Sequence, residues 1–491
     1  MILNHANRKL AKRFFDEITE IGIDFKLGDR VTERHLTAEE GKALITALPL
    51  EGAPTQAVLD EFVDTILPYC TNFSSKNFMG FPDSGNSVAA IGGSMLCNFL
   101  QQNLINQSFC APSATFVEIA VLQWLREVVG YNNQEVEDVW DVGGIITTGG
   151  TLSNTLGIML ARENRFPGAM ENGVVDPDKC RLIVPKDIGH YSVKSAQMWL
   201  GCGSRLIEVE TDNFKYNLKD LRDKLEENKD KVMCVVAYAG DSRTMTVDNF
   251  SEIARIVRSI DKNIWLHADA CHGFSLGFSQ ELKGKLKGIE EFDSITLDPH
   301  KVMMTPYTIS ALLVKDPSKF KSITSLSDLI MQEPFAFGQI TPLLGSRSWD
   351  SLKLWFAMKN LGRSGLNDLI NKRHASASYL ANKLRDDPDF ILLNEVEINA
   401  VAFMYKKGIA ITDLEKLNSI NRYMHELIIK EGLYHLHQFS IPDAGRIKKG
   451  SIVYPHRFMS GNPNTTEKEI DAMLEYVREL GDRVVTKTIN D

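Results

Sequence analysis

The sequence predicts an α/β protein with a mostly parallel central sheet that is flanked by helices. From about residue 140 to residue 315, short runs rich in apolar and β-branched residues alternate with amphipathic stretches. One of these stretches carries Leu218, Leu221 and Leu225 on one helical face. Because crossover helices make neighbouring strands parallel, we expect ligands to bind beyond the carboxyl ends of the strands.

Each run in this region is a predicted element of the sheet domain. The expected strands are 181–184, 205–209, 232–239, 264–270, 294–297 and 308–314, and the expected helices are 217–228 and 249–261. This order of elements is typical of successive β-α-β units.

The segments on both sides are predicted to be mainly helical and to give the chain three parts. We expect a helical N-terminal arm at residues 1–90, a large α/β domain at 91–350 and a small C-terminal α+β domain at 351–491. Within these parts, one or two long helices are expected at 97–130 and further helices at 349–360 and 367–385, with a strand section at 390–405. A capping box formed by Thr466 and Glu469 starts a last helix, which is expected to end at Gly481.

The composition is that of an ordinary globular protein. Hydrophobic residues make up 43% and charged residues 24% of the 491 residues, which excludes disordered and fibrous classes. The formal net charge of −9 argues against nucleic acid or an anionic membrane as a partner, but it leaves a local anion site open. Seven scattered cysteines without a C-x-x-C pair, no long apolar run and no targeting pattern favour a cytoplasmic protein.

A glycine-containing turn at residues 147–154 is the first candidate site. It follows an apolar run and opens a helix, where free backbone N–H groups and the helix dipole favour a phosphate. The turn has neither the Walker spacing nor the G-x-G-x-x-G spacing. A tight turn capped by a threonine is an equally good interpretation of this segment alone.

Acidic and basic side chains at the ends of two further strands are the next candidates. His267, Asp269 and Cys271 share one face of a strand, which is compatible with a metal site, but a carboxylate that stabilises a buried cationic nitrogen fits better. Lys301 follows another strand in Asp298-Pro299-His300-Lys301, where it is suited to bind a carbonyl carbon. A lone lysine is usually a solvated charge. Together, a phosphate cradle, an acid and this lysine predict a site for pyridoxal 5′-phosphate and no metal.

The same residues resemble a known family. Residues 293–301, Asp-Ser-Ile-Thr-Leu-Asp-Pro-His-Lys, resemble the D-S-[IV]-x-x-[DN]-P-H-K pattern of the group II pyridoxal-phosphate-dependent amino-acid decarboxylases, which include glutamate, aromatic amino-acid and tyrosine decarboxylases. Segments 267–270, 149–154, 112–118 and 345–347 support the resemblance, which extends over about residues 77–481. The resemblance implies a fold-type I transferase-like architecture, an amino-acid substrate that is converted to an amine and CO2, and a homodimer.

The resemblance also implies roles for individual residues. Lys301 corresponds to the lysine that binds the cofactor aldehyde, Asp269 to the partner of the pyridine nitrogen, and His190 to the residue stacked on the ring, where an imidazole is also able to shuttle protons. The remaining positions are cofactor or substrate contacts: Gly150, Thr151, Ala270 and His300 near the cofactor, Gly345 and Ser346 reaching the phosphate from the second subunit, and Arg457 at the substrate α-carboxylate.

Two departures from the family pattern affect the expected chemistry. Asp241 and Arg243 stand where the family usually has a Gly-Thr-Thr segment; we expect them to pair with each other, with Arg243 meeting an acidic substrate as the alternative. The expected catalytic loop, 325–340, contains phenylalanines and no tyrosine. Relatives with phenylalanine there are able to give aldehydes with oxygen, so decarboxylation-dependent aldehyde formation stays an alternative, together with proton delivery by His190 and a non-catalytic relative. Tyr307 is too near Lys301 in sequence to be assumed as a replacement.

The substrate side chain is left open by the sequence. Phe78, Phe81 and Gln101 resemble positions that line the family's side-chain pocket, partly across a subunit interface. The phenylalanines favour an aromatic side chain, whereas Gln101 or Arg243 favours a carboxylate.

Overall fold

A seven-stranded sheet forms the centre of the computed structural model, which describes residues 2–324, 327, 334–341 and 343–490. The strand order is β1-β9-β8-β7-β6-β2-β3, with β9 antiparallel to both neighbours and the pairs from β8 to β3 parallel. The strands are β1 (Gly144–Thr147), β2 (Arg181–Pro185), β3 (Leu206–Val209), β6 (Val232–Tyr238), β7 (Trp265–Asp269), β8 (Ser294–Leu297) and β9 (Ser310–Val314). The predicted mostly parallel sheet is confirmed.

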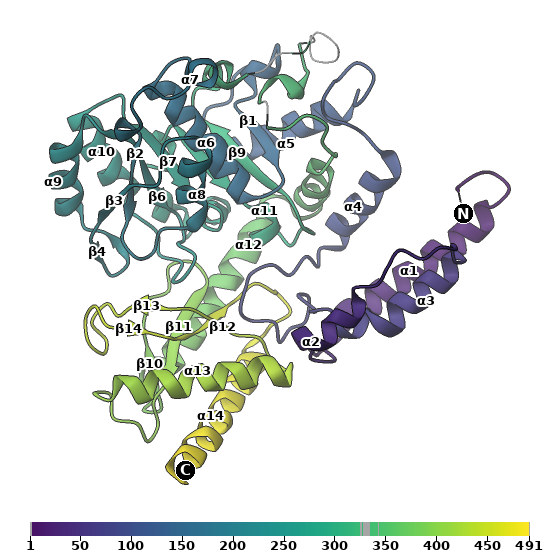
Figure 1. The fold of residues 1–491 in the computed structure, drawn as a ribbon, viewed down its shortest axis with the longest axis vertical. Helices are drawn as coiled ribbons and strands as arrows, with labels where there is room; N and C mark the ends of the chain where they lie inside the picture. The colour runs from purple at the N-terminus through teal and green to yellow at the C-terminus, as the bar shows by residue number, and fades with distance from the viewer. Residues whose placement is uncertain (1, 325–326, 328–333, 342, 491) are drawn as a thin grey trace.

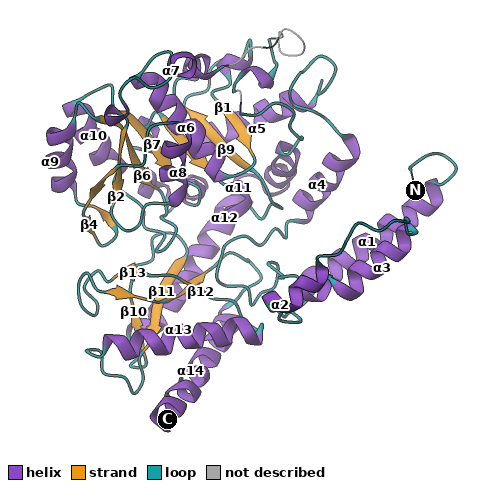
Figure 2. Cartoon of the chain, in the orientation of Figure 1, coloured by secondary structure: helices purple, strands orange, loops and turns teal. Residues whose placement is uncertain are grey.

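Helices surround this sheet (Figure 2). α10 shows why they form: Asn249 caps its first turn by accepting from the Glu252 backbone, and Ile253, Ile256 and Val257 are buried on one face. The helices of this part are α4 (Val88–Leu100), α5 (Ala114–Val128), α6 (Gly150–Arg165), α7 (Ala169–Asn172), α8 (Tyr191–Trp199), α9 (Leu218–Asn228), α10 (Phe250–Ile260) and α11 (Pro299–Val302). The two helices expected between the strands are therefore present.

The one or two helices expected at residues 97–130 are two, α4 and α5, but the expected start at residue 97 is wrong. α4 begins at Val88 and ends at Leu100, because Gln101 adopts a left-handed conformation with φ 53°. Leu104 and Ile105 are buried without being helical. Apolar residues therefore continue through a loop, and their spacing alone does not reveal the helix end.

A second, four-stranded antiparallel sheet lies in the C-terminal part. Its order is β10-β11-β15-β12, and the expected strand section 390–405 is two strands of it. The elements are α12 (Ser351–Arg385), β10 (Phe390–Leu392), β11 (Ala400–Tyr405), α13 (Leu414–Glu431), β12 (His437–Gln438), β15 (His456–Met459) and α14 (Glu467–Asn490). α12 is interrupted at Gly362, with φ 62°, between the two helices that the sequence predicts. Short two-stranded pairs complete the fold: β4 (Thr211–Asp212) with β5 (Lys215–Tyr216), and β13 (Ile441–Pro442) with β14 (Ile452–Val453).

The prediction that the last helix ends at Gly481 is wrong. The Thr466 backbone N–H does donate to Glu469, as the capping box requires, but α14 continues to Asn490. A Cβ atom at position 481 would lie 2.5 Å from the Tyr405 ring. Glycine is therefore needed there for close packing of α14 against β11, and not for a helix end.

The N-terminal helices form an arm that extends away from the rest of the chain (Figure 1). α1 (Arg8–Leu27) and α3 (Thr55–Thr65) lie side by side, and the short α2 (Ala38–Gly41) lies near the base of the arm (Figure 1). Apolar side chains on the arm and on α4 are exposed, including Leu27 at 75% and Phe99 at 53%. Among the described residues, no helix is both long and apolar enough to cross a bilayer.

Candidate active site

A cavity of about 240 Å³ lies where the carboxyl ends of β6, β7 and β8 meet the N-terminus of α6. Parallel strands end at the same sheet edge, which is why residues far apart in sequence meet there. Of the predicted site residues, the cavity is lined by Gly150, Thr151, His190, Asp269, His300 and Lys301.

Lys301 forms an ion pair with Asp298 at this cavity. β8 ends at Leu297, and the single turn of α11 brings Lys301 Nζ to 2.7 Å from Asp298 Oδ2. Burial alone would lower the pKa of Lys301, but the negative charge of Asp298 outweighs it, so this pKa is raised overall. Lys301 and His300 conversely hold the pKa of Asp298 below its usual value although burial opposes them.

Asp269 is the last residue of β7, and it lines the cavity. Oδ2 accepts a hydrogen bond from Asn154 Nδ2 at 2.9 Å, and Oδ1 accepts from the Cys271 backbone at 3.2 Å. An acceptor held in this way is suited to a protonated ring nitrogen.

His190 precedes the first turn of α8 and lines the same cavity. Its Nδ1 atom lies 2.6 Å from Ser192 Oγ. Burial lowers the pKa of His190, and the nearby Asp269 carboxylate offsets this only in part. The imidazole is therefore neutral at physiological pH.

The first turn of α6 forms a cradle at the cavity wall. A Cβ atom at Gly150 would lie 2.8 Å from Asp298 Oδ2 and 2.9 Å from Cys271 Sγ, so a larger residue is excluded. Thr151 adds a hydroxyl, and the sixteen-residue helix directs its positive end to the cavity. Cradle, carboxylate and lysine thus fit the phosphate, ring nitrogen and aldehyde of pyridoxal phosphate.

Arg457 and Phe81 lie beside this cavity and not in its wall. The Arg457 guanidinium stacks 5.1 Å from the Phe81 ring, and its Nη atoms donate to the backbone carbonyls of Ser242 and Gly80. Ser242 lines the cavity, so Arg457 reaches its edge through this contact. Ala270 is fully buried and does not line the cavity.

Gln101, Gly345 and Ser346 are not brought to the cavity of their own chain. Gln101 Nε2 donates to the Asn98 carbonyl beside the end of α4. Asn103 Nδ2 donates to Ser346 Oγ at 3.0 Å, which places Ser346 next to the same region. These predicted positions therefore gather on an exposed surface near α4.

The expected pairing of Asp241 with Arg243 has a different form. Asp241 accepts from the backbone N–H groups of Arg243, Thr244 and Thr246 and from the Thr244 hydroxyl. The carboxylate therefore shapes a turn after β6 through the backbone of Arg243, not through its guanidinium.

The expected catalytic loop lies partly outside the described residues. Of its phenylalanines, Phe337 is buried under the Arg347 guanidinium and Phe335 packs against Phe116. Both described rings therefore belong to the protein core and its edge, not to the cavity wall.

Two residues at the site were missed or set aside by the sequence prediction. Tyr307 lines the cavity together with Lys301, and burial and the nearby Asp83 carboxyl raise the pKa of its hydroxyl. Burial raises the pKa of Asp83, opposed by Lys301 and His300. Asp83 lies two residues after Phe81, which was expected at the side-chain pocket, and this proximity was the available signal for it.

Comparisons with known proteins agree on the family and differ on the substrate. The model of the pyridoxal-dependent decarboxylase conserved domain matches residues 39–406. The chain is 24% identical to an aromatic-L-amino-acid decarboxylase of Bacillus atrophaeus, over 90% of this chain and 88% of that protein. It is 26% identical to an aspartate 1-decarboxylase of Aliivibrio fischeri, over 91% of this chain and 87% of that protein.

A solved structure has the same fold. The crystal structure of mouse CSAD in apo form superimposes with a TM-score of 0.85 at 24% identity, and the match covers 97% of this chain and 99% of that chain. The fold-type I architecture is thereby confirmed. With the domain match over three quarters of its length, the chain belongs to the pyridoxal-dependent decarboxylase family, as an amino-acid decarboxylase whose cofactor is pyridoxal 5′-phosphate.

Proposed function

We propose that the cavity at β7 and β8 decarboxylates an L-amino acid to the corresponding amine and CO2. The observation that carries this proposal is that Lys301, Asp269 and the first turn of α6 line one cavity. When bound, the cofactor supplies an electron sink for the charge left at the substrate α-carbon. Lys301 holds the cofactor aldehyde, Asp269 keeps a proton on the ring nitrogen, and Gly150 and Thr151 hold the phosphate.

Arg457 is proposed to bind the α-carboxylate of the substrate. Its Nε atom is buried without a hydrogen-bond partner in the described structure. Burial lowers the pKa of Arg457 to about 10, so the guanidinium is still charged at neutral pH. An incoming carboxylate would satisfy the unpaired N–H, and this contact would orient the bond that breaks.

Tyr307 is the proposed source of the proton that the α-carbon receives. Among the tyrosines that line the cavity, Tyr307 is the one nearest to Lys301 in sequence, and Asp83 lies close enough to influence the pKa of its hydroxyl. Aldehyde formation with oxygen is the alternative, because it takes place when the α-carbon is not protonated. Amine, CO2, aldehyde and peroxide measured in one assay distinguish the two reactions: amine equal to CO2 supports the proposal, and aldehyde with peroxide contradicts it.

We infer that the preferred substrate carries a neutral or cationic side chain. Asp83 lines a second cavity, which shares His300 and Tyr307 with the active site. A buried carboxylate there disfavours an acidic side chain by like-charge repulsion. Amine release from the twenty amino acids and 2,4-diaminobutyrate tests this inference; aspartate or glutamate as the best substrate would overturn it.

A homodimer is proposed because large apolar side chains on and near one helix, α4, are exposed. On and near α4 these residues are Met95, Leu96, Phe99, Leu100, Phe109 and Phe116. Because Gly345 and Ser346 lie outside their own cavity, we propose that they complete the site of the second copy. All seven cysteines are free thiols, which supports the proposed cytoplasmic location.

Subunit mixing tests the shared site. Lys301→Ala and Ser346→Glu chains are each expected to be inactive, whereas mixed dimers regain activity because one of their sites combines an intact Lys301 with an intact Ser346. Mixed dimers that stay inactive would place Ser346 at the site of its own chain, and an active Ser346→Glu protein would place it at neither site.

Absorbance of the bound cofactor tests the catalytic proposal directly. The purified protein with added pyridoxal phosphate is expected to show the band of a lysine imine, and Lys301→Ala is expected to abolish it. Lys315→Ala changes an exposed lysine after β9 and serves as the control. A protein that stays colourless, or a band that survives in Lys301→Ala, would contradict the proposal.

A further inference from the structure

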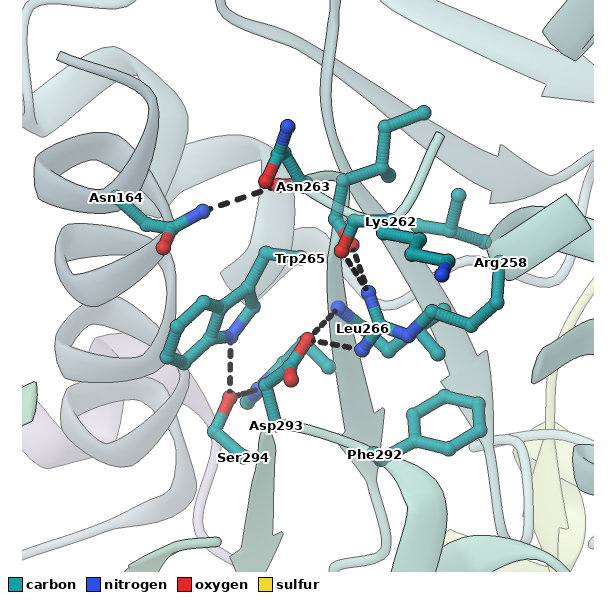
Figure 3. Close-up of polar contacts among 12 residues, drawn as sticks. Asn164, Arg258, Lys262, Asn263, Trp265, Leu266, Phe292, Asp293 and Ser294 are labelled. Carbon is teal, nitrogen blue, oxygen red and sulfur yellow. Dashed lines mark hydrogen bonds and ion pairs between the residues drawn. The ribbon is translucent and has the colours of Figure 1, made fainter. Parts of the chain in front are cut away.

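A continuous chain of buried side chains connects Trp265 with both Asp269 and His190. Trp265 Nε1 donates to Ser294 Oγ at 2.8 Å, a contact that Figure 3 shows, and Ser294 Oγ lies 2.8 Å from His267 Nδ1. His267 Nε2 lies 3.0 Å from Asn154 Oδ1. Each of these side chains has at most 3% of its surface exposed.

At the active site, the series of hydrogen-bonded side chains branches at Asn154. Its Nδ2 atom lies 2.9 Å from Asp269 Oδ2 and 2.8 Å from Ser192 Oγ. An ionised carboxylate only accepts hydrogen bonds, so the atom that faces Asp269 is the amide nitrogen, and the Asn154 carbonyl faces His267. The reverse orientation would bring two oxygens to 2.9 Å.

The orientation of Asn154 determines the tautomer of His267. Because the Asn154 carbonyl only accepts, His267 Nε2 carries a proton, and Nδ1 accepts from the Ser294 hydroxyl. Thr296 Oγ1 is farther from Nε2, at 3.5 Å. Burial lowers the pKa of His267 to about 4, in agreement with a neutral ring that has one donor and one acceptor.

The branch from Asn154 through Ser192 determines the tautomer of His190 in the same way. Ser192 Oγ accepts from Asn154 and therefore has its own proton available for His190 Nδ1, at 2.6 Å. The Ser192 backbone N–H, which is always a donor, also points to Nδ1, at 3.3 Å. Two donors on Nδ1 leave the ring proton on Nε2.

We propose that Asn154, Ser192 and His267 are positioning residues that lock His190 as the Nε2–H tautomer. In this form His190 is a fixed hydrogen-bond donor to a bound cofactor or substrate, and its Nδ1 atom is not available to carry a proton to the α-carbon. The inference deepens the proposed function, because it rests on the location of His190 at the active site.

The charged neighbours of His190 do not undo this lock. Asp269 and Asp298 favour a proton on the ring, whereas Lys301, Arg243 and burial oppose it. In the cation both ring nitrogens are protonated. Protonation of Nδ1 would cost the contact to the Ser192 backbone N–H and would require the Ser192 hydroxyl to change from donor to acceptor. Without the lock, either nitrogen of a neutral imidazole would be able to carry the proton.

Nitrogen NMR of histidine-labelled protein without cofactor measures the tautomer directly. The His190 signals are identified as those that disappear in His190→Asn. We expect Nδ1 at the position of a non-protonated imidazole nitrogen and Nε2 at that of a protonated one, unchanged when pyridoxal phosphate is added. A proton on Nδ1, or exchange between both tautomers, would overturn the proposal even if the enzyme is an active decarboxylase.

Asn154→Asp tests whether the hydrogen-bonded side chains determine the tautomer of His190. The new carboxylate accepts the Ser192 hydroxyl proton, so His190 Nδ1 loses its main donor and its signal shifts towards the protonated position. Asn164→Asp is the matched control on α6. Asn164 Nδ2 donates to the Asn263 carbonyl, as Figure 3 shows, and neither residue lines the cavity. Its replacement should leave the His190 signals unchanged.

Ser192→Ala is a second variant, which deletes one hydroxyl and keeps the backbone donor. We expect the Nδ1 signal to move in the same direction as in Asn154→Asp, by a smaller amount. If neither variant shifts the His190 signals relative to the Asn164→Asp control, the hydrogen-bonded side chains do not determine the tautomer and the proposal is wrong.

Discussion

Lys301 Nζ lies 2.7 Å from Asp298 Oδ2, so the proposed cofactor-binding lysine is held as a cation by the residue three positions before it. A protonated amine is not a nucleophile. The ion pair therefore controls the pH at which Lys301 is able to react.

Asp298→Asn should let Lys301 react with pyridoxal phosphate at lower pH. Without the carboxylate charge, burial dominates and lowers the pKa of Lys301, by about one to three units. The rate of appearance of the imine band, measured against pH in cofactor-free protein, should shift by that amount. Ser310→Ala removes the hydroxyl that donates to Asp298 and keeps the charge, so it should shift the profile less. Equal profiles for Asp298→Asn and the wild type would contradict this account.

Gly150→Ala should weaken cofactor binding. The added Cβ would lie within 3 Å of both Asp298 oxygens and Cys271 Sγ, and overpacking of this kind costs about 1–3 kcal/mol. We expect the dissociation constant for pyridoxal phosphate, measured by absorbance titration, to rise about tenfold. Gly149→Ala is the comparison, since its Cβ would meet no atom within 4 Å. A larger effect at Gly149 than at Gly150 would show that the steric argument is wrong.

Tyr307→Phe should separate loss of CO2 from formation of amine. The variant keeps the ring and removes the acidic hydroxyl, and the loss of a positioned acid typically costs at least about 10²-fold in the proton-transfer step. Amine should fall by roughly that factor, with aldehyde and peroxide becoming the main products in air. Phe73→Leu is the control for the aromatic contact that Tyr307 makes. Unchanged amine yield in Tyr307→Phe would assign proton delivery to another residue.

His267→Gln should make stability less dependent on pH. The pKa of folded His267 is about 4, below the value of about 6.5 in an unfolded chain. The unfolded state therefore binds more protons between these values, so the contribution of His267 is complete above pH 6.5 and is lost as pH falls towards 4. The difference corresponds to about 3 kcal/mol.

Denaturant unfolding between pH 4 and 7 measures this dependence. In His267→Gln the decrease in unfolding free energy at low pH should be smaller than in the wild type, although other buried histidines, such as His456, keep part of it. Identical slopes for the two proteins would mean that His267 takes up its proton in the folded state.

The sheet and much of the candidate site could be predicted from local sequence. Alternating apolar runs and amphipathic stretches specify a parallel sheet, and parallel strands end at one edge. This geometry brings Asp269 and Lys301 to the same cavity as the first turn of α6, although more than a hundred residues separate Gly150 from Asp269. Gly150, Asp269 and Lys301, which belong to segments that carry the family resemblance, lie at this edge.

Contacts between distant segments were decided by the tertiary structure alone. Tyr307 meets Asp83 across more than two hundred residues, and the Asp241 carboxylate shapes a turn where charge alone suggested an ion pair. Gly481 fits the pattern of a helix end, but the ring of Tyr405 requires it inside α14.

The sequence by itself determined the order of elements, the family and the set of reactive groups, because periodicity and short motifs are local properties of the chain. The tertiary structure decided which groups face each other and in which hydrogen-bonding sense. Burial is the physical reason: inside the protein each donor needs an acceptor, so the single carboxylate of Asp269 sets the orientation of Asn154, and through it the tautomers of His267 and His190.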